Sequence, residues 1–297
     1  MGDAVGFVGL GIMGLPMAGN LAKGGTVFGY DLREERRRLA EVTIEPTSSI
    51  EEICRRCDTV FLSLPSSAAV REVCCGEPGL LGQLRSGSLV VDTSTTEPAV
   101  SRDVAQTLAA RGIRFLDAPV SGGEQAAKDG TLSFMVGGDE KTFDEAVPLL
   151  DRMGSSVVRV GEVGAGEVAK LVNNLIVGIT FAAVAEGFSL GTQSGIDPAE
   201  LHRAIRGGWA GSRVLEVAAP AMLAHDFTPG GTVDIHWKDL GYALSLAKET
   251  DVPTPMTALA HEVFKAARAA GLGGESQPAV IKLWESLGQG ADRSGRQ

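Results

Sequence analysis

The sequence has few cysteines, and it lacks the partners that would give them a structural role. Four cysteines occur in 297 residues, namely Cys54, Cys57, Cys74 and Cys75. The CxxC of Cys54 and Cys57 has no second cysteine pair at zinc spacing and no nearby histidine, which argues against a metal site. No apolar N-terminal run with a cleavage site precedes it. We therefore expect reduced, idle thiols and a cytoplasmic location.

Positive charge is also scarce. The chain has 27 Lys and Arg residues against 37 Asp and Glu residues, a net charge of -10. Non-specific binding of nucleic acid needs a basic surface, so nucleic acid is not an expected partner. No internal repeat or low-complexity block is evident. The 44% of hydrophobic and 22% of charged residues are typical of a soluble globular protein, and the length favours two domains.

A glycine-rich turn follows the first apolar run. Residues 4–8 predict a strand, GLGIMG follows at positions 9–14, and a helical pattern continues to Lys23. In a dinucleotide-binding turn the first glycine permits the tight bend, the second admits the pyrophosphate, and the third lets helix and strand pack closely. The helix N-terminus offers free N–H groups to the phosphate. The predicted cofactor-binding residues are Gly9, Leu10, Gly11, Ile12, Met13 and Gly14.

An acidic residue ends the second predicted strand, residues 26–30. Asp31 lies 22 residues after Gly9, where a carboxylate accepts both ribose hydroxyls of NAD and repels the 2′-phosphate of NADP. NAD is therefore the favoured cofactor. NADP stays open because Arg33 and the arginines at 36–38 offer phosphate contacts.

Strand and helix patterns alternate as far as Gly161, with further strands expected at 59–64, 88–91, 114–116, 132–136 and 157–160. This alternation predicts an α/β fold with a Rossmann-type doubly wound sheet, whose ligand crevice lies at the carboxyl ends of the strands. Leu64, Pro65 and Thr95 follow such strands and are predicted to line the nicotinamide site. Ordinary strand-to-helix turns explain these three residues equally well.

A serine and two glycines follow the strand at 114–116. Ser121, Gly122 and Gly123 place backbone N–H groups beside a hydroxyl, which makes an anion cradle suited to a substrate carboxylate.

A stretch without proline runs from Gly164 to Gly195. At about 1.5 Å per residue such a helix spans roughly 45 Å, long enough to join two domains. Lys170, Asn173 and Asn174 share one side of it. Its apolar part has the length of a membrane span, but Asn173, Asn174 and Glu186 lie inside it and favour packing between protein layers.

Helical patterns dominate the remainder, at 199–205, 239–250, 255–270 and 277–287. We expect a dinucleotide-binding domain at 1–162, an interdomain helix at 163–195, an all-α domain for substrate and oligomer contacts at 196–290, and a frayed tail at 291–297. The oligomer expectation, a homodimer or homotetramer, rests on fold analogy.

Four motifs resemble those of the 3-hydroxyisobutyrate dehydrogenase, or β-hydroxyacid dehydrogenase, family. They are FVGLGIMGLPMAGNL at 7–21, DAPVSGG at 117–123, GAGEVAKLVNN at 164–174, and Lys238 with Asp239. Their order and spacing match over nearly the whole chain, which makes chance similarity improbable. The resemblance implies an NAD(P)-dependent oxidoreductase acting on a short β-hydroxyacid or semialdehyde. Tartronate semialdehyde is the first candidate substrate, with threonate and 3-hydroxyisobutyrate as alternatives.

The resemblance also assigns roles to residues. Lys170 is implied as the catalytic lysine and Asn174 as a substrate-orienting amide, with Asn173 in support. Ser121 and its glycines hold the carboxylate, Lys238 contacts cofactor or substrate, and Asp239 supports Lys238. Proton return to a lysine at neutral pH requires a pKa below the usual 10.4, which burial and a neighbouring cation would provide.

Two other classes of protein stay open. A non-enzymatic NAD-binding scaffold would be expected to lose the catalytic lysine, and an imine reductase would more naturally have Asp or Tyr in place of Lys170. His236, two residues before Lys238, is interpreted as a structural residue rather than an alternative acid.

Overall fold

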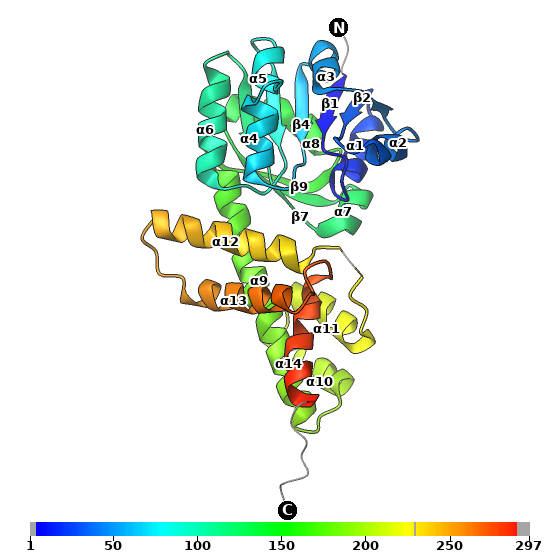
Figure 1. The fold of residues 1–297 in the computed structure, drawn as a ribbon, viewed down its shortest axis with the longest axis vertical. Helices are drawn as coiled ribbons and strands as arrows, with labels where there is room; N and C mark the ends of the chain where they lie inside the picture. The colour runs from blue at the N-terminus through cyan, green and yellow to red at the C-terminus, as the bar shows by residue number, and fades with distance from the viewer. Residues whose placement is uncertain (1–3, 229, 290–297) are drawn as a thin grey trace, which may run out of the picture. The chain divides into compact units, whose positions relative to one another are not determined.

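The chain divides into two compact units in a computed structural model that describes residues 4–228 and 230–289 (Figure 1). Unit 1 comprises Met1–Lys170 and unit 2 comprises Leu171–Gln297. The division falls inside the long helix α9, Ala165–Gln193. The first six residues of this helix therefore belong to unit 1.

Unit 1 is built on one mostly parallel sheet. Its strands are ordered β3-β2-β1-β4-β5-β6-β8-β7, and β9 pairs with β8. The six parallel strands are β1 Val5–Val8, β2 Val27–Tyr30, β3 Glu45–Pro46, β4 Thr59–Leu62, β5 Leu89–Asp92 and β6 Arg114–Asp117. The order 3-2-1-4-5-6 is that of a Rossmann domain, so the predicted fold is confirmed.

The remaining strands extend this sheet beyond β6. They are β7 Val120–Ser121, β8 Leu132–Gly137 and β9 Gly154–Gly161. The β8 strand runs antiparallel to both β6 and β7 and parallel to β9. The pairing of β7 with β8 places Ser121 opposite Ser133.

Helices cover both faces of the sheet because its central strands are apolar on both sides. One core contains Leu21, Ala127 and Leu150, which come from α1 Gly14–Ala22, α7 Gly123–Asp129 and α8 Glu140–Leu150. The opposite core takes its helical residues from α3 Ile50–Arg56, α4 Ser67–Cys75, α5 Leu80–Gln83 and α6 Pro98–Ala109. The remaining helix of unit 1, α2, Glu34–Ala40, is short and largely exposed.

Unit 2 contains helices and no strand within its described residues. After α9 they are α10 Pro198–Ile205, α11 Arg213–Ala224, α12 Val233–Glu249, α13 Pro255–Ala269, the 3₁₀ turn η1 Gln277–Ile281 and α14 Lys282–Gln289. Residues of α9, α11, α12, α13 and η1 share one core. Asp197 caps α10 by accepting the Ala199 and Glu200 N–H groups, and Pro198 stands at its first position, where proline fits because no N–H is needed there.

The helices of unit 2 differ from the sequence-based expectation at three places. Helix α12 begins at Val233 and not at Asp239, because Thr232 accepts the Ile235 N–H at 3.3 Å and caps it six residues earlier. Helix α11 was not expected at all, and it includes Pro220. The helix expected at 277–287 is a 3₁₀ turn, Gln277–Ile281, followed by α14, which extends to Gln289. The tail at 291–297 lies outside the described residues.

Helix α9 buries only one face in the single chain. Buried positions in unit 2 recur every three or four residues, at Leu171, Asn174, Gly178, Phe181, Ala185 and Phe188, and Ser189 next to Phe188 is buried as well. On the opposite side Ile176 is 57% and Leu190 70% exposed. By length and composition α9 would suffice to cross a membrane. Its buried Asn174 instead donates to Asp239 within unit 2.

The four cysteines are free thiols in unit 1. Cys54, Cys57 and Cys74 are buried in the core beneath α3 and α4. Burial raises the pKa of Cys54 to about 11 and that of Cys57 to about 12.

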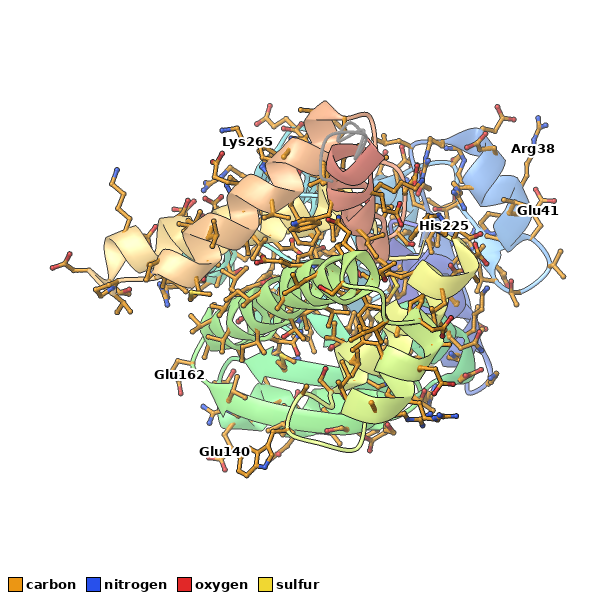
Figure 2. All side chains as sticks on the ribbon, turned by 90° about the horizontal axis from the view of Figure 1, so that it is seen from below. Arg38, Glu41, Glu140, Glu162, His225 and Lys265 are labelled. Carbon is orange, nitrogen blue, oxygen red and sulfur yellow. The ribbon has the colours of Figure 1, made fainter. Side chains whose placement is uncertain are left out.

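No group of three or more potential metal ligands occurs among the described residues. Charged residues such as Glu140, Glu162 and Lys265 lie at the surface, as Figure 2 shows.

Candidate functional site

The glycine turn after β1 is shaped by contacts that exclude side chains. Gly9 has φ of +95°, and a Cβ there would lie 2.2 Å from the Ser63 carbonyl oxygen. A Cβ on Gly14 would lie 1.9 Å from the Gly9 oxygen. At Gly11, by contrast, a Cβ would meet no atom within 4 Å. The turn is therefore tight at both ends and open in the middle, and this open side suits the approach of a pyrophosphate.

Asp31 links this turn to the end of β2. Its Oδ2 accepts the Leu10 N–H at 2.9 Å, and its Oδ1 accepts the Arg33 N–H at 2.9 Å. Each oxygen retains acceptor capacity for a ribose hydroxyl. The Leu10 side chain is fully buried in the core while Ile12 is 43% exposed, so Leu10 contributes to the turn only through its backbone.

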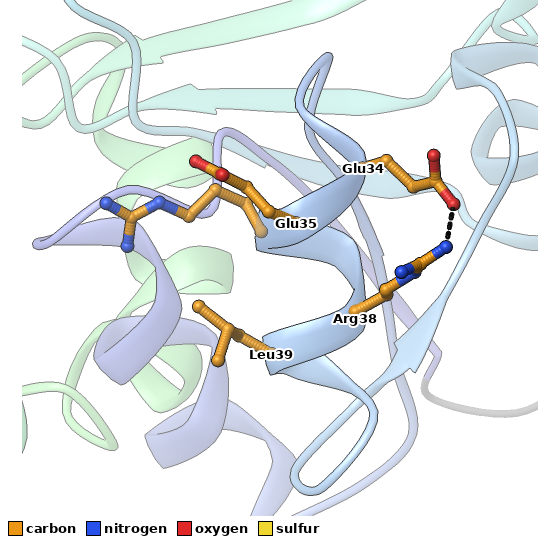
Figure 3. A pocket seen from close by; sticks show the side chains of 5 residues that line it. Glu34, Glu35, Arg38 and Leu39 are labelled. Carbon is orange, nitrogen blue, oxygen red and sulfur yellow. Dashed lines mark hydrogen bonds and ion pairs between the residues drawn. The ribbon is translucent and has the colours of Figure 1, made fainter.

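A separate pocket lies beside α2 (Figure 3). It is lined by Glu34, Glu35, Arg36, Arg38 and Leu39. None of these residues belongs to the glycine turn, and Arg38 pairs with Glu34 at 2.6 Å across the helix surface. The cofactor residues predicted within unit 1 lie elsewhere, at the carboxyl edge of the sheet, while Lys238 lies on α12 of unit 2.

The loops after β4 and β5 are tied to each other at that edge. The Leu64 N–H donates to Ser94 Oγ at 2.8 Å, and Thr93 Oγ1 donates to the Leu62 carbonyl at 2.6 Å. Strands β1, β2, β4 and β5 are parallel, so their carboxyl ends share one edge of the sheet. The glycine turn, Asp31, Leu64 with Pro65, and Thr95 are therefore all placed along this edge.

Ser121 ends the short strand β7, and its two glycines lead into α7. Gly122 and Gly123 have φ of +135° and +73°, conformations that glycine adopts at no steric cost. Ser121 is partly exposed and the two glycines are exposed. A hydroxyl and neighbouring backbone N–H groups are thus open to an anion.

Two buried acids hold the start of α9, and the sequence did not point to their roles. Asp117 Oδ1 accepts the Gly164 N–H at 2.7 Å, and Oδ2 accepts the Glu167 N–H at 3.0 Å. Thr96 Oγ1 donates to Glu167 Oε1 at 3.0 Å. Lys170 follows one helical turn after Glu167 and is partly buried. The sequence feature that could have indicated the role of Glu167 is its position three residues before Lys170 in an otherwise apolar helix.

Burial dominates the electrostatics of these acids. It raises the pKa of Asp117, although the N–H groups at the start of α9 act in the opposite direction. Burial, together with the charges of Asp92 and Asp117, raises the pKa of Glu167 well above its usual range.

In unit 2 Asp239 contacts Lys238, as predicted, and also Asn174, which was not predicted. Its Oδ2 accepts from Asn174 Nδ2 at 2.7 Å, and its Oδ1 lies 2.9 Å from Lys238 Nζ. Asn173 Nδ2 donates to Asn174 Oδ1 at 2.9 Å. Because one N–H and one lone pair of Asn174 remain, its amide is oriented and still able to bind a ligand.

His236 packs beneath the same residues. Its Nε2 lies 3.0 Å from the Asn174 carbonyl oxygen, and its Nδ1 lies 3.1 Å from Gln277 Nε2. A carbonyl can only accept, so Nε2 carries the hydrogen and Nδ1 accepts. A Cβ on Gly178 would lie 2.6 Å from the ring nitrogen. The ring is 2% exposed and thus serves to pack α12 against α9.

A Rossmann sheet with a glycine turn open at Gly11 and a carboxylate at the end of β2 defines a dinucleotide-binding protein. Residues 4–161 match the family model for the NAD-binding domain of 6-phosphogluconate dehydrogenase. Residues 164–284 match that for the NAD-binding region of NADP-dependent 3-hydroxyisobutyrate dehydrogenase. The chain belongs to the 3-hydroxyisobutyrate dehydrogenase family of β-hydroxyacid dehydrogenases, and it is an NAD(P)-dependent oxidoreductase.

Similar proteins span this chain almost completely. The 2-(hydroxymethyl)glutarate dehydrogenase of Eubacterium barkeri is 39% identical, over 99% of this chain and 98% of its own length. The 2-hydroxy-3-oxopropionate reductase of Escherichia coli is 37% identical, over 95% and 97%. The solved Mycobacterium tuberculosis 3-hydroxyisobutyrate dehydrogenase with L-serine is 32% identical with a TM-score of 0.87, over 95% and 99%.

Proposed function

We propose that this protein transfers a hydride between NAD and a short β-hydroxyacid, with Lys170 as the proton donor and acceptor. The observation that carries the proposal is the anchoring of the start of α9. Asp117 and Glu167 join this helix to the ends of β6 and β5, which form the same edge as the predicted cofactor loops. Lys170 lies one turn further along α9.

Lys170 performs the proton half of the reaction. Oxidation of an alcohol removes a hydride from carbon and a proton from oxygen, and a neutral lysine takes the proton. In the reverse direction the ammonium returns it to the carbonyl oxygen. The nicotinamide, when bound, accepts or supplies the hydride. The turn from Gly9 to Gly14 and Asp31 would hold the pyrophosphate and ribose, and Leu64, Pro65, Thr95 and Lys238 would contact the remainder.

The substrate would be held by its carboxylate and its reacting oxygen. The Ser121 hydroxyl and the N–H groups of Gly122 and Gly123 bind the carboxylate, which fixes the carbon that faces the nicotinamide. Asn174, oriented by Asp239 at 2.7 Å, binds the reacting oxygen without adding charge. Tartronate semialdehyde, reduced to glycerate, is our first candidate.

The substituent on C2 distinguishes the candidate substrates. Glycerate, 3-hydroxyisobutyrate and 2-(hydroxymethyl)glutarate all carry a CH₂OH group on the carbon that bears the carboxylate. They differ there by a hydroxyl, a methyl or a carboxyethyl group. The E. barkeri relative, named for 2-(hydroxymethyl)glutarate, makes the last a second candidate.

A spectrophotometric screen tests the proposal. We expect turnover of glycerate or tartronate semialdehyde to exceed that of 3-hydroxyisobutyrate, 2-(hydroxymethyl)glutarate, threonate and serine. NAD(H) should be preferred over NADP(H), because the Asp31 carboxylate would repel a 2′-phosphate. Absence of turnover with every substrate, despite cofactor binding, would instead support the scaffold alternative. A strong NADP preference would overturn the assignment of Asp31.

We further propose a homodimer or homotetramer in a reducing, cytoplasmic setting. Ile176, Ala183, Gly187 and Leu190 are exposed along α9 and form an apolar stripe that a second copy would cover. Sedimentation should give a mass of at least twice 30.8 kDa. Leu190→Glu should shift the protein towards a monomer, whereas Glu186→Gln on the same helix should not. A monomeric wild type at micromolar concentration would refute the proposal.

A further inference from the structure

Glu167 is a carboxyl group with less hydrogen bonding than a buried anion requires. It is 0% exposed and lies in the first turn of α9. Thr96 donates to its Oε1 at 3.0 Å, while its Oε2 has no hydrogen-bond partner among the described residues. An ionised carboxylate in such a place would be costly, because each oxygen needs donors to replace water.

The groups that face Glu167 from the sheet make ionisation less favourable still. Asp92 ends β5 and Asp117 ends β6, and both are 0% exposed. Asp117 is stabilised as an anion by the Gly164 and Glu167 N–H groups. A second anion beside it would be repelled at low effective dielectric. A neutral acid fits the geometry better.

The bond to Thr96 connects two elements of the proposed site within unit 1. Thr96 is fully buried and lies 2.9 Å from Ser101 Oγ at the start of α6. It is adjacent in sequence to Thr95, the predicted lip of the nicotinamide site. Glu167 is one turn before Lys170, and residues three apart share a helix face. The bond between Glu167 and Thr96 therefore joins the helix turn before Lys170 to the residue after Thr95.

We propose that Glu167 is a neutral carboxylic acid that positions Lys170 by tying the first turn of α9 to Thr96. This role rests on the proposed function of Lys170. Glu167 is a positioning residue because it acts through the helix and the loop. A different role, an ionised Glu167 that exchanges protons with Lys170, would require its charge, and the two roles separate on replacement by glutamine.

Three variants compare the two roles by activity. Glu167→Gln retains the shape and the bond to Thr96, so its kcat should stay within about twofold and its pH profile should be unchanged. Glu167→Leu and Thr96→Val lose the bond, and kcat should fall tenfold or more with a small change in KM, because a misplaced catalytic group slows chemistry. Glu162→Gln, an exposed acid just before α9, is the control. A Gln variant as inactive as Leu, or with a shifted pH profile, would overturn the proposal.

Two measurements test whether Glu167 is neutral and do not depend on enzymatic turnover. They can therefore fail while the proposed function of Lys170 holds, and the reverse. The infrared difference spectrum between wild type and Glu167→Gln should show a protonated carboxyl band at pH 8.

The second measurement is the pH dependence of the unfolding midpoint. A pKa raised on folding means that wild type loses stability as pH rises from the unfolded value through the folded value. The unfolding midpoint of Glu167→Gln relative to wild type should therefore increase from pH 5 to pH 8. A carboxylate band in place of the acid band would refute the neutral state of Glu167. So would an unfolding midpoint of Glu167→Gln that falls with pH relative to that of wild type.

Discussion

Lys170→Ala is expected to lower kcat by about 10²–10⁴-fold, the usual contribution of a positioned acid or base. The loss should appear at saturating cofactor and substrate. Lys170 follows the anchored first turn of α9, and no other group proposed here carries out the proton transfer. Cofactor affinity should change little, because Lys170 is not among the predicted cofactor contacts, which lie in the glycine turn, at Asp31, in the loops after β4 and β5, and at Lys238.

The matched control is Lys128→Ala. Lys128 is an exposed lysine of unit 1 that pairs with Glu124 at 2.7 Å, and its loss should leave kcat within about twofold, since surface pairs contribute little. Lys170→Arg keeps the charge but cannot act as a base near neutral pH, so it should be nearly as inactive as the alanine variant. Near-normal turnover in Lys170→Ala would remove the lysine from the mechanism. The measurement is steady-state kinetics in both directions with cofactor binding followed separately.

Asp117→Ala is expected to cost about 3 kcal/mol of unfolding free energy. The side chain is 0% exposed and accepts two backbone N–H groups from the start of α9. Charged hydrogen bonds contribute about 1.5–3 kcal/mol each, and a buried N–H left unpaired costs a similar amount. Burial of the carboxylate offsets part of this gain, as its raised pKa indicates, so the lower end of the range applies.

Urea denaturation monitored at the unit 1 transition measures this loss. Asp144→Ala, an exposed acid on α8, should change stability by less than about 0.5 kcal/mol. Activity of Asp117→Ala should fall as well, because the first turn of α9 carries Lys170. Equal stability of the two variants would mean that Asp117 does not secure the helix start.

Local patterns in the sequence predicted the central strands of unit 1. Short apolar runs bounded by turn residues predicted β1, β2, β4 and β5 within two residues, since a strand buried on both faces must be continuously apolar. The GxGxxG spacing predicted the turn because only glycine fits where a Cβ on Gly14 would lie 1.9 Å from the Gly9 oxygen. Helix α11 escaped detection, since Pro220 interrupts its pattern.

The motifs that carry the family resemblance were also local in sequence. Lys170, Asn174 and Ser121 were proposed from them, and they remain proposals for experiment. Lys170 and Asn174 are four residues apart, and this spacing places them on the same face wherever the chain is helical. Helix α9 is continuous from Ala165 to Gln193, so the condition is met.

The sequence by itself thus determined the Rossmann class, the family and the candidate catalytic residues, because these depend on short-range spacing and residue type. Only the tertiary structure identified the partners of Asp117, Glu167 and Asp239. The hydrogen bonds of Asp117 to the start of α9, of Thr96 to Glu167 and of Asn174 to Asp239 join residues at least 47 positions apart. No periodicity records which buried donor meets which buried acceptor. Whether a buried acid is charged depends on those partners, so the neutral state inferred for Glu167 could be reached only from the fold.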